Sequence, residues 1–105
     1  MPHPSRDANH YEIKAALESL GAEVLDFSGA PRRGKVPELA GTPDLLTVWP
    51  ATPHDRYVWV EVKTMAGRLN DNERAWWAAH PDLEKRVICD LNGCAALAQQ
   101  MGRVR

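Results

Sequence analysis

Two short acidic motifs in the middle of the chain hold side chains suited to metal-dependent chemistry. The first is Gly41-Thr42-Pro43-Asp44 and the second is Glu61-Val62-Lys63. Carboxylates at the end of apolar segments are costly to bury unless a cation or a metal ion pairs with them. Asp44 and Glu61, with Lys63 beside them, therefore predict a divalent metal site that suits the cleavage of phosphodiester bonds.

The second motif ends a segment, residues 56–63, in which β-branched and aromatic residues predict a strand. Alternate side chains of a strand point to opposite faces, so Trp59, Glu61 and Lys63 share one face. Taken alone, Glu61 and Lys63 are also compatible with a surface ion pair, and Asp44 with a turn that follows a proline. The two motifs together favour a site.

Two other glutamates each allow two interpretations. Glu12 and Glu73 both stand three residues after an asparagine, which matches the capping box of a helix start. Glu12 falls at the edge of an apolar helical stripe, from which its carboxylate can also reach a cleft beside the sheet as a ligand. Glu73 falls inside such a stripe, where Lys63 or Arg68 is an alternative partner to the cap.

The charges give weak support for a nucleic-acid partner. The formal net charge is −1, which argues against a broad basic surface. The balance becomes weakly positive if metal neutralises Glu12, Asp44 and Glu61. Three cations also gather in the Gly/Pro-rich loop 28–41, where they either face solvent or bind phosphate: Arg32, Arg33 and Lys35.

Hydrophobic periodicity and breaker residues predict the element order αβββαβα. Asn9 is expected to cap the first helix and Gly21 to end it. The expected strands cover residues 22–27, 44–49, 56–63 and 86–91, and the later helices cover 70–81 and 93–101. The short turn 50–55 predicts an antiparallel hairpin, and the next strand–helix–strand unit a right-handed parallel crossover. Trp76 and Trp77 are expected in a core or a dimer interface.

The composition fits one ordinary globular domain. The chain has 105 residues, of which 44% are hydrophobic and 26% charged. Residues 1–8 are expected to be a flexible N-terminus, and residues 9–105 a single domain. No segment has the length or pattern of a membrane span or secretory signal, which favours the cytoplasm. Cys89 and Cys94 lack metal-ligand spacing and are expected to be buried thiols.

The chain resembles the VRR-NUC family, the virus-type replication-repair nucleases of the PD-(D/E)xK nuclease superfamily. The resemblance covers residues 9 to 100 and rests on Glu12, Gly41-Thr42-Pro43-Asp44-Leu45, Glu61-Val62-Lys63 and Gly67-Arg68-Leu69. It implies an α/β restriction-endonuclease-like αβββαβα core with a four-stranded mixed sheet flanked by helices. The family commonly has Gln where this chain has Glu73, so a carboxylate replaces an amide beside the site.

The resemblance also implies the roles of the site residues. Asp44, Glu61 and the backbone carbonyl of Val62 would bind Mg²⁺, for which Mn²⁺ would substitute, and Glu12 would hold the metal through water or bind a second ion. Lys63 would orient the attacking water or stabilise charge on the phosphate. Glu73 would lie next to these residues, where it would pair with Lys63, add a metal ligand or weaken the activity. The expected DNA-binding residues are Arg32, Arg33, Lys35 and Arg68.

Stand-alone members of the family look like homodimeric nucleases that cut branched DNA such as Holliday junctions. The expectation is therefore a metal-dependent DNA endonuclease, encoded by a bacterium or a phage. A non-cleaving DNA-binding module of a replication, repair or defence complex is the main alternative, because Glu73 departs from the family. A sequence-specific restriction-type nuclease is disfavoured, since 105 residues leave little room for a recognition domain.

Overall fold

The computed structural model describes residues 9–29 and 40–103, so the expected flexible segment 1–8 lies outside the described residues. The observed elements follow the expected order: α1 (His10–Ser19), β1 (Glu23–Asp26), β2 (Leu45–Trp49), β3 (Arg56–Val62), α2 (Asp71–Ala79), β4 (Lys85–Ile88) and α3 (Leu91–Gln100). The predicted α/β, restriction-endonuclease-like fold class is confirmed.

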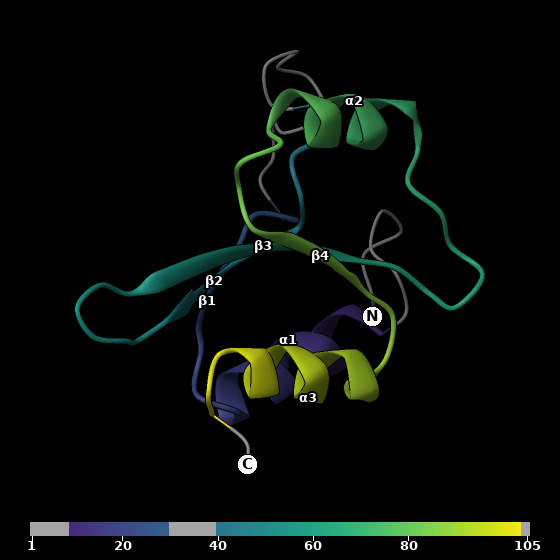
Figure 1. Cartoon of the computed structure of the whole chain (residues 1–105). Helices are drawn as coiled ribbons and strands as arrows, with labels where there is room; N and C mark the ends of the chain where they lie inside the picture. Colours follow the sequence, from purple (N-terminus) through teal and green to yellow (C-terminus); the bar gives the residue numbers. More distant parts are fainter. Residues whose placement is uncertain (1–8, 30–39, 104–105) are drawn as a thin grey trace.

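The four strands form one mixed sheet in the order β1-β2-β3-β4 (Figure 1). β1 pairs with β2 and β2 with β3 in antiparallel fashion, as the short turn before Arg56 predicts. β4 pairs with β3 in parallel fashion, with α2 in the crossover between them. The predicted hairpin and the predicted parallel crossover are therefore both present.

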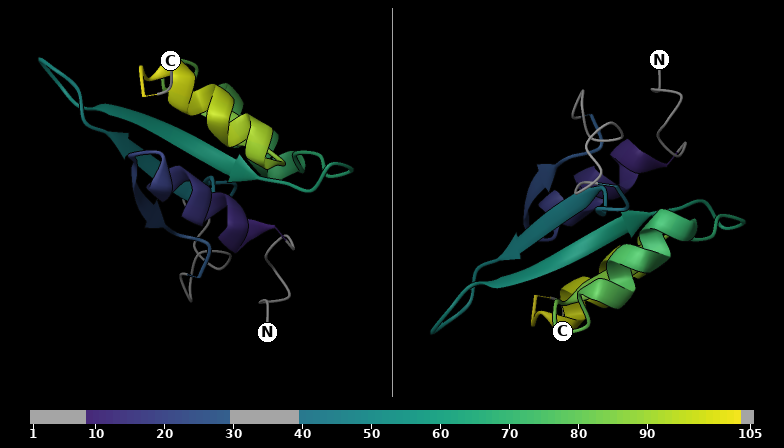
Figure 2. Two further views of the ribbon diagram at one scale, coloured as in Figure 1. Left: turned by 90° about the horizontal axis from the view of Figure 1, so that it is seen from below. Right: turned by 90° about the horizontal axis from the view of Figure 1, so that it is seen from above.

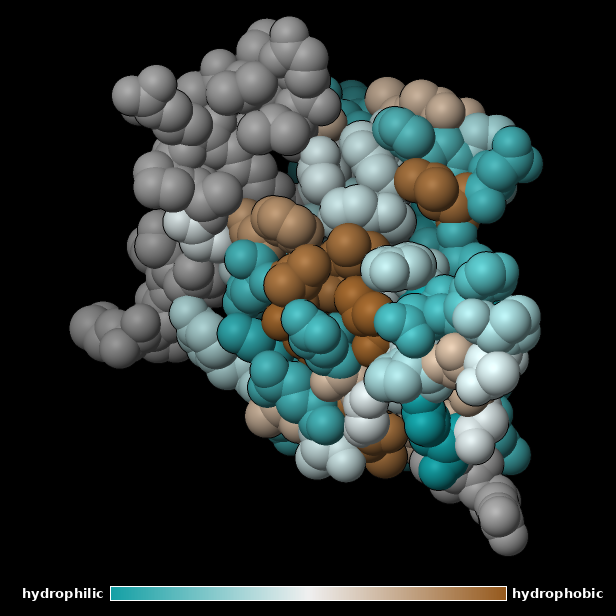
Figure 3. Space-filling view, turned by 90° about the vertical axis from the view of Figure 1, so that its left-hand side faces the viewer, coloured by the Kyte–Doolittle hydropathy of each residue, from teal (hydrophilic) through white to brown (hydrophobic). Residues whose placement is uncertain are grey.

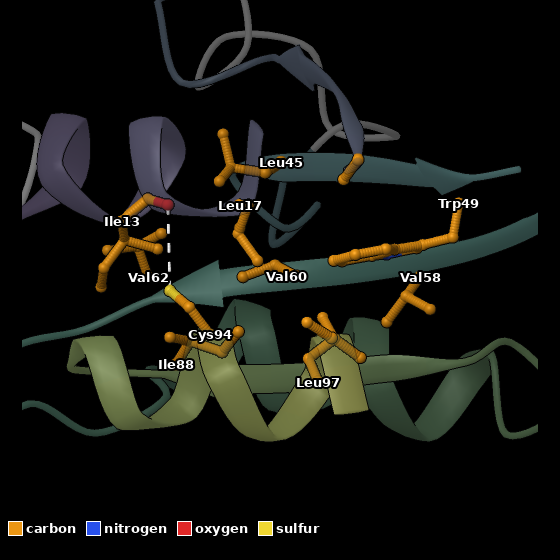
Figure 4. Packing of buried hydrophobic residues seen from close by; sticks show 12 residues of the cluster. Ile13, Leu17, Leu45, Trp49, Val58, Val60, Val62, Ile88, Cys94 and Leu97 are labelled. Atoms are coloured by element: carbon orange, nitrogen blue, oxygen red, sulfur yellow. Dashed lines mark hydrogen bonds between the residues drawn. The ribbon is translucent and has the colours of Figure 1, made fainter. Parts of the chain in front are cut away.

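The helices lie on both faces of the sheet. α1 and α3 cover one face and α2 lies over the other, as the views from below and from above show (Figure 2). The main core fills the layer between the sheet and the α1–α3 pair (Figure 4). Val58, Val60 and Val62 all point into this core, which confirms the predicted alternation along β3. Ile13 and Leu17 of α1 meet them there.

The opposite face carries a chain of aromatic rings that links the sheet to α2. The ring centroid of Trp59 lies 5.8 Å from that of Phe27 and 5.6 Å from that of Trp76. Trp76 in turn lies 4.2 Å from His80. Both tryptophans remain half-buried, so this layer packs less completely than the core beneath α1 and α3.

Local chemistry explains where two helices begin and end. Gly21 has a φ of 113°, a left-handed conformation that glycine adopts without strain, and it ends α1 as expected. α3 begins two residues earlier than predicted, because the Asp90 carboxylate caps it by accepting a hydrogen bond from Gly93 N at 2.8 Å. No described helix is long and apolar enough to cross a membrane.

Two predictions about single residues were wrong. Cys94 is buried as expected, and its thiol donates to the Ile13 carbonyl at 3.8 Å (Figure 4). Cys89, in contrast, is only partly buried and lies 3.2 Å from the Met65 sulfur. Asn9 occupies the N-cap position of α1, but its side chain makes no capping hydrogen bond.

Candidate active site

The register of the β2–β3 hairpin brings the two predicted carboxylates together. Leu45 pairs with Val60 in the antiparallel register. Because Asp44 precedes Leu45 and Glu61 follows Val60, Asp44 lies beside Glu61. Two backbone contacts fix Asp44: its Oδ2 accepts from Val62 N at 3.1 Å, and its carbonyl accepts from Phe27 N at 2.8 Å. Asp44 is therefore held between β1 and β3 at the entrance to β2.

Glu61 is a buried carboxylate with an unusual environment. Only 2% of its surface is exposed, and its Oε1 is buried without a hydrogen-bond partner among the described residues. Burial raises the pKa of Glu61 far above its usual range, and hydrogen bonding and charge from Asp44 raise it further. Lys63 opposes this rise only in part. The side chain therefore needs a proton or an added cation at neutral pH.

Lys63 follows β3 and places its ammonium among the carboxylates. Its Nζ lies 3.9 Å from Glu61 Oε2 and 2.9 Å from Glu73 Oε1. It also donates to Glu73 Oε2 at 3.1 Å. With 15% of its side chain exposed, Lys63 is partly shielded from water, which strengthens these interactions.

Glu73 fulfils both interpretations that the sequence allowed. Its Oε1 accepts from Asn70 N at 2.8 Å while the Asn70 side chain accepts from Glu73 N at 2.9 Å, which completes a capping box at the start of α2. The same carboxylate forms the ion pair with Lys63. The cap of α2 is thus also the contact between α2 and the end of β3.

Two glycines allow the backbone to approach this cluster closely. Gly41 has a φ of 85°, and a Cβ added to it would overlap the backbone of Asn72 and touch Glu73 N. A Cβ on Gly67 would lie 3.2 Å from the Lys63 Cβ. Both glycines belong to the sequence motifs. Close packing against the site explains why each of these positions is a glycine.

The residues present fit a divalent metal ion, although they do not form a complete cage. No three His, Cys, Asp or Glu side chains in the described ranges converge as a preformed metal site. Glu61 Oε1, which has no hydrogen-bond partner in the described part of the chain, is nevertheless the feature expected of carboxylates that bind a cation. A hard ion that keeps several waters needs only a few such protein oxygens.

Glu12 and Arg68 make no hydrogen bond or ion pair with the described residues of this cluster. Glu12 is exposed on α1, and its carboxylate makes no hydrogen bond or ion pair with any described residue. Arg68 is exposed in the loop between Lys63 and α2, with no such partner in the described part of the chain. The predicted phosphate-binding cations of the Gly/Pro loop lie outside the described residues: Arg32, Arg33 and Lys35.

A second polar cluster, which the sequence did not predict, ties α1 to β1. His10 is 1% exposed, and its Nε2 lies 3.0 Å from Asp26 Oδ2 and 3.1 Å from Ser28 Oγ. Ser28 Oγ also donates to Asp26 Oδ1 at 2.6 Å. Because serine and aspartate share one ring nitrogen, the cluster lacks the relay of a hydrolytic triad, in which they take opposite nitrogens.

Comparison with known families agrees with the site. The VRR-NUC domain family matches residues 10–88, which include every strand and the Asp44–Glu61–Lys63–Glu73 cluster. No curated protein and no solved structure gives a match. The family match spans well over half of the chain and coincides with the expected fold and motifs. The chain therefore belongs to the VRR-NUC domain family, a family of nucleases whose substrate is DNA.

Proposed function

We propose that this chain is a divalent-metal-dependent DNA endonuclease that acts on branched DNA as a homodimer. The observation that carries the proposal is the Asp44–Glu61 carboxylate pair, in which the buried Glu61 has one oxygen with no partner among the described residues and the Lys63 ammonium lies beside it. A structural ion pair alone would not leave a buried carboxylate oxygen without a partner. The preference for branched DNA and the homodimer rest on the resemblance to stand-alone family members.

Each residue of the site has a proposed role. Asp44, Glu61 and the Val62 carbonyl would hold Mg²⁺ or Mn²⁺, and the bound ion would acidify water and neutralise phosphate charge. The Lys63 ammonium, anchored by Glu73, stabilises negative charge on the phosphate oxygens. Glu12 is exposed, so we assign it only a contact through water. Arg68 contacts the DNA backbone from the neighbouring loop.

Cleavage of labelled DNA would test this proposal. Junction, fork, flap, single-stranded and linear duplex substrates would be incubated with Mg²⁺, Mn²⁺ or EDTA. We expect metal-dependent cuts in the junction that are lost in Asp44→Asn and Lys63→Ala. Asp82→Asn removes an exposed carboxylate and should cut like the wild type. Cuts in linear DNA alone would contradict the branched substrate, and activity in EDTA would contradict the metal.

A non-cleaving DNA-binding module is the second candidate, and one observation favours it. Glu73 holds the Lys63 ammonium at 2.9 Å, where the family commonly has the neutral Gln. If this ion pair withholds Lys63 from the phosphate, the wild-type chain binds DNA without cutting it. Glu73→Gln keeps the acceptor for the α2 cap while it removes the charge. Cutting that appears only in Glu73→Gln would support this candidate, and equal cutting by both chains would exclude it.

A further inference from the structure

Asn9 occupies a capping position but is used elsewhere. It stands at the N-cap of α1, where asparagine is among the preferred residues, and its side chain caps nothing. Its Nδ2 donates instead to the Lys63 carbonyl at 3.2 Å and to the Cys89 carbonyl at 2.7 Å. The side chain therefore connects α1 to the residues that follow β3 and β4.

The two carbonyls lie where the pairing of β3 and β4 stops. Lys63 N donates to the Ile88 carbonyl at 3.1 Å, which extends the parallel ladder just past Val62. The Lys63 and Cys89 carbonyls come directly after this bond. The Asn9 amide group, which donates to both carbonyls, therefore joins β3 and β4 just beyond their last backbone hydrogen bond, at the strand ends next to the site.

The position of the Asn9 side chain is unfavourable for its oxygen and is explained by the hydrogen bonds that its nitrogen donates. Its Oδ1 is buried and finds no hydrogen-bond partner among the described residues. A buried acceptor without a partner is unfavourable, and so is a helix start without a side-chain cap. The two donor bonds at the strand ends are therefore what determines the position of this side chain.

We propose that Asn9 is a positioning residue of the active site. By fixing the Lys63 carbonyl it sets the direction from which the Lys63 side chain approaches Glu61 and Glu73, and it limits movement of the adjacent Val62 carbonyl. This inference rests on the proposed nuclease function. It gives the start of α1 a positioning role in the site, in addition to the contact through water assigned to Glu12.

Three substitutions separate positioning from simple helix capping. Asn9→Ser and Asn9→Asp retain good capping side chains but lose the amide donors, and Asn9→Ala loses both. Thr47→Val is the matched control for stability. Thr47 is buried, and its Oγ1 donates to Val58 O at 2.7 Å and accepts from Trp49 Nε1 at 2.8 Å, on the core face of the sheet.

Single-turnover cleavage by the most active metal–substrate pair, with protein in excess, is the first measurement. We expect all three Asn9 variants to lower the rate constant by roughly 10- to 100-fold, because small displacements of catalytic groups have effects of this size. DNA affinity in EDTA should change by less than about twofold, since phosphate contacts determine it. Thr47→Val should lose stability and keep the wild-type rate constant. Wild-type rates in the two capping variants would overturn the proposal.

A second readout does not need cleavage. In the wild type, the Asn9 side-chain amide protons should exchange slowly with solvent, and Asn9→Ser should shift the NMR signals of the Lys63 side chain and weaken Mg²⁺ binding. If the wild type cuts no DNA but these effects appear, the nuclease proposal fails and the positioning role stands. Unchanged Lys63 signals and Mg²⁺ affinity in Asn9→Ser would overturn the positioning role itself.

Discussion

At the scale of single residues, the burial of Glu61 lowers the stability of the folded protein at neutral pH. A carboxyl whose pKa is raised by folding keeps its proton in the folded state while it ionises in the unfolded state. The folded state therefore loses stability as the pH rises above the ordinary glutamate pKa of 4.5. A bound cation would remove this penalty, so metal binding and stability should be coupled at this residue.

We predict that Glu61→Gln makes the metal-free protein more stable and abolishes its response to metal. At pH 7 in EDTA the variant should gain roughly 1–3 kcal/mol, because a neutral amide replaces a buried acid without a partner for one oxygen. The gain should disappear as the pH falls below about 4.5. Urea denaturation with and without Mg²⁺ would measure both effects.

The control for this prediction is Glu23→Gln, which alters an exposed glutamate on β1. It should change the stability by less than about 0.5 kcal/mol and retain the response to Mg²⁺. A Glu61→Gln variant that is less stable than the wild type in EDTA would show that the carboxylate is well accommodated without a cation.

At the scale of secondary-structure elements, α2 is positioned by polar and backbone contacts more than by an apolar stripe. Glu73 is its only buried residue, and the capping box, the Lys63 ion pair and the close approach of Gly41 all meet at its first turn. The segment that leads into Asp44 therefore packs on the start of the helix that holds Lys63. The two halves of the site depend on this contact.

We predict that Gly41→Ala disrupts the site and that Gly102→Ala does not. Both glycines have positive φ, 85° and 77°, so both substitutions introduce similar backbone strain. Only at Gly41 does the new Cβ overlap backbone, since nothing lies within 4 Å at Gly102. Gly41→Ala should cost about 1–3 kcal/mol more than Gly102→Ala in chemical denaturation and should abolish cleavage. An equal loss of stability in the two variants would show that α2 moves away from residue 41 at little energetic cost.

The hydrogen bonds of Asp26 with His10 and Ser28, which join α1 to the end of β1, predict that stability depends on pH in the acidic range. Burial alone would raise the pKa of Asp26, but hydrogen bonds from Ser28 and His10 outweigh burial and lower that pKa to about 2. A lowered pKa stabilises the fold above the ordinary value of 3.8, and this contribution is lost as the pH falls towards 2. We predict that Asp26→Asn loses about 1–3 kcal/mol at pH 7. In denaturation from pH 7 to 2 the difference should shrink below pH 4, and a constant difference would contradict this account.

The sequence predicted those parts of the fold and site that depend on local patterns. Alternation along β3 placed Glu61 and Lys63 on one face, and the hairpin brought Asp44 beside them. Asn9 could not be predicted, because its hydrogen bonds join residues 54 and 80 positions away while its local pattern is that of a cap. The His10–Asp26 pair was missed because it also joins residues that are far apart in the sequence, 16 positions in this case.

At the scale of the whole molecule, the two faces of the sheet are covered unequally. α1 and α3 cover one face, whereas on the other face α2 lies towards β4 and no other described helix lies over β1 (Figure 2). Leu25 and Phe27 remain 42% and 37% exposed there, and the register places Leu25 beside Leu46 and Leu46 beside Trp59. Figure 3 shows a patch of apolar side chains on this side of the molecule. Such a surface supports the proposed homodimer, in which a second copy would cover it.

We predict that Leu25→Glu separates the homodimer into folded monomers. Leu25 is exposed enough that a charge on it costs the monomer little, whereas a charge buried between two copies would weaken association by roughly 100-fold or more. Leu83→Glu is the matched control, because Leu83 is 43% exposed and follows α2 instead of lying on the sheet. Sedimentation equilibrium should show the wild type and Leu83→Glu as dimers and Leu25→Glu as a monomer with unchanged circular dichroism. In the proposed homodimer, two linked sites would cut both strands of a junction, so Leu25→Glu should also nick junctions on one strand at a time. A monomeric wild type would contradict the homodimer, and a dimeric Leu25→Glu would place the interface on another surface.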